Sequence, residues 1–136
     1  MKAVALLLAL AVGPAASDKD KPSISVKASP AVAFSPARIL VSVDIKGGPN
    51  DYEDFYCPSI EWAWGDGTYS NETADCEPYQ AGKSEIKRHF TTSRVYNLSG
   101  DFRVEFRLKK KDKTIAVGST IVKIRPGLGD IGGGGL

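Results

Sequence analysis

Apolar and polar side chains alternate strictly along two segments, and this two-residue period constrains the fold more than any other feature. In residues 102–109 every second residue is Phe, Val or Leu, and the residues between them are charged. Residues 38–45 carry Ile or Val at every second position. A β-strand points successive side chains to opposite faces, so each segment is predicted to be a half-buried strand.

Further short strands are expected around Ile24, along residues 59–64, at Ser84–Thr92, and at 115–124. Gly, Pro, Asn and Asp separate these segments, and no window of eleven residues after residue 17 has helical periodicity. About seven short strands within roughly 105 residues predict an all-β sandwich.

Three connections have their own signatures. Residues 68–83 are polar and are expected to form a loop, and residues 111–113 (Lys-Asp-Lys) to form a hairpin turn. In the last strand the apolar phase slips at Gly118 and Ser119, which predicts a β-bulge there.

The first 17 residues have the pattern of a secretory signal peptide. One lysine precedes a run of ten apolar residues, then Gly-Pro and three small residues follow. A membrane span needs about twenty apolar residues, so no span is expected. The predicted organisation is a signal peptide at 1–17, a β-sandwich domain at 18–125 and a flexible Gly-rich tail at 126–136. The expected location is secreted or periplasmic.

Cys57 and Cys76 are the two cysteines of the chain. In an exported protein such a pair is most simply a disulfide, which would enclose the Trp-containing strand. A redox pair or a metal site is the alternative, although no Cys-x-x-Cys spacing is present.

Two motifs resemble those of polycystic kidney disease (PKD) domains. The first is the run Trp62-Ala63-Trp64-Gly65-Asp66-Gly67. The second is Tyr96 with Gly100 four residues later, followed by alternating apolar positions from Phe102. The family usually has Asp in place of Ala63 and often His in place of Arg94.

This resemblance implies an immunoglobulin-like sandwich in which the motif residues are structural. Trp62 would fill the core between the sheets, and Asp66 would close the Gly-Asp-Gly turn by bonding backbone amides. Trp64, at the end of its strand, would be either buried or exposed for stacking on a sugar.

Charge is nearly balanced over the whole chain but unevenly distributed. Eighteen Lys and Arg residues face sixteen Asp and Glu, which argues against nucleic-acid binding. Residues 44–79 hold nine acidic residues and one basic residue, net −8, and residues 83–125 hold twelve basic and four acidic, net +8. The two halves either attract each other within the fold or bind a charged partner. The candidate binding face has four basic residues: Arg103, Arg107, Lys109 and Lys111.

Metal and catalytic chemistry have little support. One His and two Cys argue against a zinc site. Asp51, Glu53 and Asp54 are weak calcium candidates, because no calcium-loop spacing is present. The single histidine, His89, lacks a legible nucleophile partner. No cofactor is expected, and the protein is predicted not to be an enzyme.

The predicted function is that of an exported binding or adhesion module, which acts by contact with another extracellular or envelope protein. One alternative is a carbohydrate-binding module with Trp64, Tyr69 or Tyr79 as the stacking platform. Another is a structural subunit that self-associates through its charged halves or its Gly-rich tail.

Overall fold

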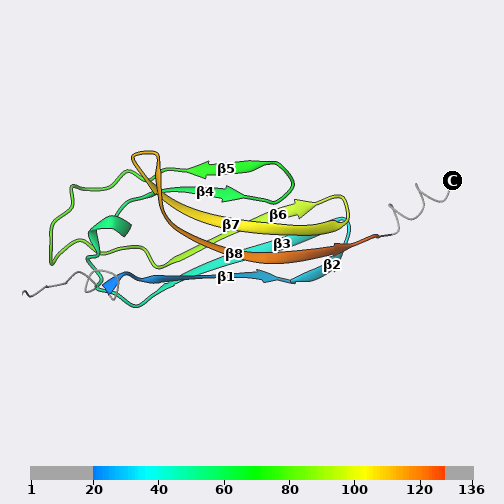
Figure 1. Ribbon diagram of the computed structural model, residues 1–136, viewed down its shortest axis with the longest axis horizontal. Coiled ribbons are helices and arrows are strands. Elements are labelled where there is room, and N and C mark those ends of the chain that lie inside the picture. The colour runs from blue at the N-terminus through cyan, green and yellow to red at the C-terminus, as the bar shows by residue number, and fades with distance from the viewer. Residues whose placement is uncertain (1–19, 128–136) are drawn as a thin grey trace, which may run out of the picture.

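The computed structural model describes residues 20–127, which form eight strands and one short 3-10 helix (Figure 1). The elements are β1 (Ser23–Ser29), β2 (Val32–Phe34), β3 (Ala37–Lys46), η1 (Glu53–Phe55), β4 (Ser59–Ala63), β5 (Tyr69–Glu72), β6 (His89–Tyr96), β7 (Gly100–Lys110) and β8 (Lys113–Arg125). Within this part of the chain, no helix is long and apolar enough to cross a membrane.

The strands form two facing sheets, which confirms the predicted all-β sandwich. One sheet has the order β1-β3-β6 and the other has the order β2-β8-β7-β4-β5. All strand pairs are antiparallel except β2 with β8, which is parallel. In Figure 1 the strands of the two sheets overlap, with β5 and β4 near the top of the view and β1 and β2 near the bottom.

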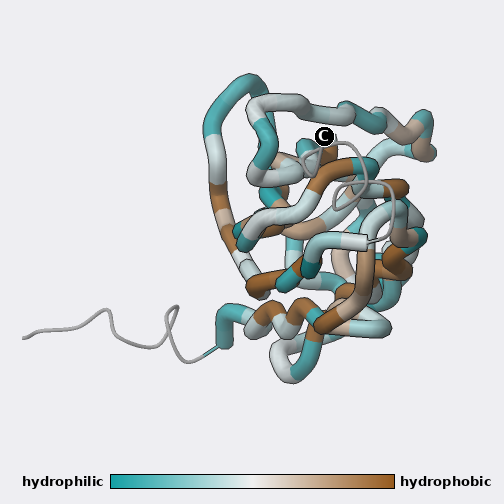
Figure 2. The backbone as a smooth tube through the Cα atoms, turned by 90° about the vertical axis from the view of Figure 1, so that its right-hand side faces the viewer, coloured by the Kyte–Doolittle hydropathy of each residue, from teal (hydrophilic) through white to brown (hydrophobic). Residues whose placement is uncertain are grey.

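The alternating segments provide the centre of the core. Their inward side chains have at most 4% exposure, as the two-residue period predicted; they are Ile39, Val41, Val43 and Ile45 of β3 and Val104, Phe106 and Leu108 of β7. Figure 2, which looks along the long axis, shows hydrophobic and hydrophilic residues alternating along the chain. Burial of these two apolar faces against each other holds the sheets together.

The segment between β4 and β6 differs from the sequence prediction. Residues 69–72, predicted as loop, pair with β4 as the edge strand β5. The next strand begins at His89 and ends at Tyr96, so the expected boundaries Ser84–Thr92 were wrong. Arg88, just before this strand, donates hydrogen bonds from its guanidinium to the carbonyl of Ile45 in β3 and to those of Gly47 and Gly48 in the β3–η1 connection.

The β-bulge lies three residues earlier than predicted. The register between β7 and β8 shifts between Leu108 and Lys109, where Ile115 is the extra residue. Gly118 instead pairs regularly with Phe106. A Cβ atom at Gly118 would lie 2.6 Å from the Cγ2 atom of Ile24, so glycine is required there by the close approach of β1.

Cys57 and Cys76 form the predicted disulfide, with their Cα atoms 6.1 Å apart. The predicted hairpin turn is also present, since Lys111 and Asp112 both have positive φ between β7 and β8. The predicted signal peptide, residues 1–17, and residues 128–136 of the predicted tail lie outside the described residues. Gly127 lies within them, and its N–H donates to Ser35 Oγ at 3.0 Å.

Removing the disulfide tests its contribution to stability. We expect the double substitution Cys57→Ala, Cys76→Ala to lower the free energy of unfolding by about 3 kcal/mol, because the unfolded chain gains entropy when the loop is opened. Denaturant unfolding with and without reductant measures the effect. The reductant should destabilise the unsubstituted protein by a similar amount and leave the variant unchanged; a variant as stable as the oxidised protein would contradict the expectation.

Candidate binding surface

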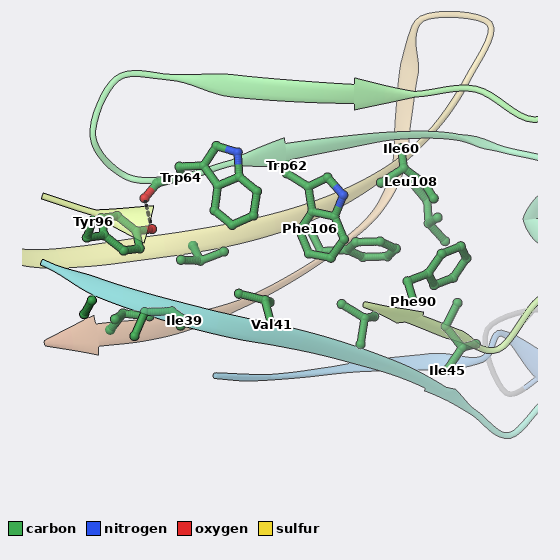
Figure 3. Packing of buried hydrophobic residues seen from close by; sticks show 14 of the residues in the cluster. Ile39, Val41, Ile45, Ile60, Trp62, Trp64, Phe90, Tyr96, Phe106 and Leu108 are labelled. Carbon is green, nitrogen blue, oxygen red and sulfur yellow. Dashed lines mark hydrogen bonds between the residues drawn. The ribbon is translucent and has the colours of Figure 1, made fainter. Parts of the chain in front are cut away.

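The two tryptophans of the Trp-x-Trp-Gly-Asp-Gly motif are part of the core. Trp62 and Trp64 are 1% and 2% exposed, and their rings stack with centroids 5.6 Å apart (Figure 3). Each indole N–H donates to a side chain of the edge strand β5, Trp62 to Glu72 and Trp64 to Ser70, both at 2.9 Å. Trp64 therefore has no face free for a sugar ring, and that alternative was wrong for this residue.

The Gly-Asp-Gly turn is closed by the side chain of Asp66. Its Oδ1 atom accepts hydrogen bonds from the backbone N–H of Thr68 at 3.0 Å and from the Thr68 hydroxyl. Its Oδ2 atom accepts from Arg94 Nη2 at 2.8 Å. Gly65 has φ of 84°, and a Cβ atom there would lie 2.7 Å from the backbone of Arg103. The turn thus packs directly on β7.

The environment of Asp66 favours its charged form. Burial acts to raise the pKa of this carboxyl, but hydrogen bonds from Thr68 and Arg94 together outweigh burial and lower the pKa. Arg94 stands where PKD domains often have His, and its guanidinium also lies over the Trp64 ring at 5.4 Å.

Tyr96 connects β6 to the end of β4. Its hydroxyl donates a buried hydrogen bond to the Trp64 carbonyl at 2.7 Å (Figure 3). Its ring stacks on Phe102 with centroids 4.5 Å apart, beside Gly100. Burial, with a smaller contribution from the Asp66 charge, raises the pKa of Tyr96 to about 12. The hydroxyl therefore stays protonated and donates at physiological pH.

Most of the basic face predicted on β7 is neutralised by acidic neighbours. Arg107 contacts Glu61 and Glu105 at 2.7 Å each, and these hydrogen bonds lower the pKa of both carboxyls. Lys109 lies 3.6 Å from Glu61, and Arg103 lies 3.5 Å from Glu105. Glu61 of the acidic half thus pairs with Arg107 and Lys109 of the basic half, across β4 and β7. This pairing leaves less positive charge on β7 for a partner.

Lys111 lies apart from this network. It is exposed in the β7–β8 hairpin turn, where its φ is 52°. The hairpin also meets the acidic half of the chain, because Lys110 Nζ donates to the Glu53 carbonyl at 2.7 Å.

An unpaired apolar and basic patch lies along β2 and β8. Val32, Phe34, Val117 and Ile121 are between 43% and 69% exposed, and strand alternation and register place them on the outer face of the five-stranded sheet. Lys123 and Arg125 are the β8 partners of Val32 and Phe34. These six residues are called the β2–β8 surface below.

Sequence reasoning missed the β2–β8 surface. Phe34 lies between Pro30 and Pro36, in a segment where no contact site was predicted. The sequence does place Val32 and Phe34 at alternate positions of a short segment. This pattern points to a surface only once β2 is known to pair with β8.

The other aromatic candidates for sugar binding are differently placed. Tyr69 is 58% exposed on β5, with the Arg107 guanidinium 5.9 Å from its ring centroid. The Tyr79 ring packs edge-on against Tyr56, and its hydroxyl donates to the Asp51 carbonyl. These two tyrosines therefore do not form one flat platform.

The acidic and histidine candidates lie in ordinary surface contacts. Asp51 Oδ2 accepts a hydrogen bond from Gly82 N at 2.8 Å, and His89 Nδ1 lies 2.8 Å from Asp44 Oδ1. Glu53 and Asp54 are exposed in η1. Among residues 20–127, no three His, Cys, Asp or Glu side chains are grouped closely enough to hold a metal ion.

Comparison with known proteins relates the chain to others by fold. No protein-family model and no curated protein matches its sequence. The PKD domain of an M14-like peptidase from Thermoplasmatales archaeon SCGC AB-540-F20 aligns with a TM-score of 0.52 and 14% identity, covering 79% of this chain and 98% of that one. The CARDB domain of a Pyrococcus furiosus protein, solved in complex with di-metal ions, aligns with a TM-score of 0.50 and 13% identity. That alignment covers 79% of this chain and 97% of the CARDB chain. The expected PKD-like, immunoglobulin-like fold is therefore confirmed.

The Asp66–Arg94 contact predicts a specific response to acid. The folded-state pKa of Asp66 lies below its unfolded value, so its stabilisation is present above the unfolded pKa of about 3.9 and is lost as pH falls through the folded pKa. We expect Asp66→Asn to lower the free energy of unfolding at pH 7 by about 1 kcal/mol and to flatten its decline in acid. Denaturant unfolding from pH 7 to pH 2 measures both.

Asp101→Asn is the matched control, because Asp101 is an exposed acid on β7. The control should keep the acid dependence of the unsubstituted protein. Equal acid slopes for Asp66→Asn and the unsubstituted protein would show that the Arg94 contact does not stabilise the fold.

Proposed function

We propose that this protein is an exported, non-enzymatic binding module that contacts another secreted or envelope protein through the β2–β8 surface. The observation that carries this proposal is the exposure of Val32, Phe34, Val117 and Ile121 on one face beside the side chains of Lys123 and Arg125. Apolar side chains gathered on one face of a soluble domain mark a contact site more often than scattered ones do.

The composition of the surface indicates the chemistry of the partner. Phe34, 69% exposed, would be the aromatic anchor that fills a pocket in the partner. Lys123 and Arg125 form no ion pair within residues 20–127, unlike Arg107, so they are free to meet carboxylates. The proposed partner surface is therefore apolar at its centre and acidic at its margin.

Two features support export. Residues 1–17 have the order of charge, apolar run and small residues that a signal peptide requires. The Cys57–Cys76 disulfide is a bond that persists mainly in oxidising compartments. The proposed location is therefore outside the cell or in the periplasm.

Self-association is the second candidate function, and the free edge of β8 favours it. Strand β2 pairs with β8 only at Lys123–Arg125, so the rest of β8 is hydrogen-bonded to β7 on one side and to no described strand on the other, although β1 of the facing sheet passes close by. A second copy could add a strand there by β-augmentation. Its signature would be a size in solution that depends on protein concentration.

The capture of partners by the oxidised protein, residues 18–136, tests the proposal. Phe34→Ala combined with Ile121→Ala should reduce capture of a specific secreted or envelope protein by at least about tenfold, because two buried contacts of the interface are lost. Leu40→Ala combined with Leu98→Ala is the matched control, since both leucines are exposed elsewhere on the domain. Binding of the captured protein is then quantified by titration.

The possible outcomes separate the candidates. Equal loss in both double variants would contradict a role for the β2–β8 surface. Capture of polysaccharide alone, lost on Tyr69→Ala, would replace the protein partner with a glycan. Capture of no partner together with concentration-dependent size would favour self-association.

A further inference from the structure

A cleft of about 250 Å³ opens on the side of the sandwich where the chain passes from β5 to β6. It lies away from the β2–β8 surface, because β2 and β5 are the opposite edges of the five-stranded sheet. Its lining combines core residues, both cysteines of the disulfide and three charged side chains.

The floor of the cleft is an edge of the hydrophobic core, where Ile60 and Phe90 are each 7% exposed. Ile60 of β4 and Phe90 of β6 approach each other from opposite sheets (Figure 3). Buried Pro58 and half-buried Tyr56 extend this apolar lining. A compact aromatic or aliphatic group could therefore leave water by entering the cleft.

The Cys57–Cys76 disulfide forms one wall. It fixes the segment containing Ala74 beside the end of η1. Tyr56 also holds this wall in place, because its hydroxyl donates a hydrogen bond to the Glu77 carbonyl at 2.6 Å. The cleft is thus held by a covalent bond and does not depend on a ligand for its shape.

The rim carries more negative than positive charge. Glu72 and Glu85 line it, and Asp75 and Glu77 flank the wall residue Cys76 in the sequence. Glu72 is held in place by the Trp62 indole N–H, which donates to one carboxylate oxygen at 2.9 Å. The second oxygen of that carboxylate remains available to a ligand.

The cleft already accommodates one cation of the protein itself. The Lys87 ammonium lies over the Phe90 ring, 4.9 Å from its centroid. An aromatic face attracts a cation through its quadrupole, so this ring face, next to Glu72 and Glu85, is suited to an ammonium group. Lys87 occupies the position that a cationic ligand would take.

We propose that this cleft is a binding site for a small organic cation, with an apolar body against Ile60 and Phe90 and an ammonium group between Glu72 and Glu85. Lys87 competes with the ligand for the same ring face, and so weakens binding. The site is independent of the β2–β8 surface and of the function proposed for it.

Titration of the oxidised protein with benzylamine, followed by NMR chemical shifts, tests the site. Saturable shifts are expected at Ile60 and Phe90, with binding at least about fivefold weaker for benzyl alcohol and for benzoate, which lack the positive charge. Glu72→Gln with Glu85→Gln should weaken benzylamine binding by a similar factor. Lys87→Met should tighten it, a result that a merely destabilised fold cannot produce.

Glu53→Gln is the matched control, because it removes a carboxylate from η1 without touching the cleft lining. It should leave benzylamine binding unchanged. The proposal is overturned if benzylamine gives no saturable shifts at Ile60 and Phe90, if benzoate binds as well, or if Lys87→Met weakens binding.

Discussion

The hydrogen bond from the Tyr96 hydroxyl to the Trp64 carbonyl is the constraint that sets how the two sheets meet at the tryptophan motif. Tyr96 ends β6 of one sheet, and Trp64 follows β4 of the other, so this bond adds a fixed polar contact between layers that apolar burial holds together. A buried carbonyl without a donor is costly. The bond therefore fixes where the Gly-Asp-Gly turn leaves the sheet, and Asp66 then holds Thr68 and Arg94 beside the stacked tryptophans.

Electrostatics divides the outer face of the five-stranded sheet into two regions. Between β4 and β7, Arg107 satisfies Glu61 and Glu105, so charges that look like a binding face in the sequence mainly stabilise the fold. Along β2 and β8, apolar side chains lie beside the cations of Lys123 and Arg125. The proposed contact surface is therefore the part of this face that has no internal ion pairs.

Sequence reasoning succeeds where structure is local and fails where it depends on distant contacts. The two-residue period of β3 and β7 and the positive-φ turn at Lys111 and Asp112 are local, and the structure has them. The segment before β6 is held by Arg88, which bonds carbonyls about forty residues away in sequence. Gly118 looked like a bulge because its contact with Ile24 of the facing sheet has no local signature. The pairing of Arg107 with Glu61, 46 residues away in sequence, could not be read from charge counts for the same reason.

The measurement that tests the account most directly is the effect of Tyr96→Phe on stability and on partner capture in the same preparation. Tyr96 and the tryptophan motif are scaffold, whereas partner contact is proposed for the β2–β8 surface. We therefore expect a loss of about 1–3 kcal/mol in the free energy of unfolding, because the Trp64 carbonyl loses its donor, with unchanged partner affinity of the folded protein. Unchanged stability, or lost affinity in a protein that is still folded, would contradict it.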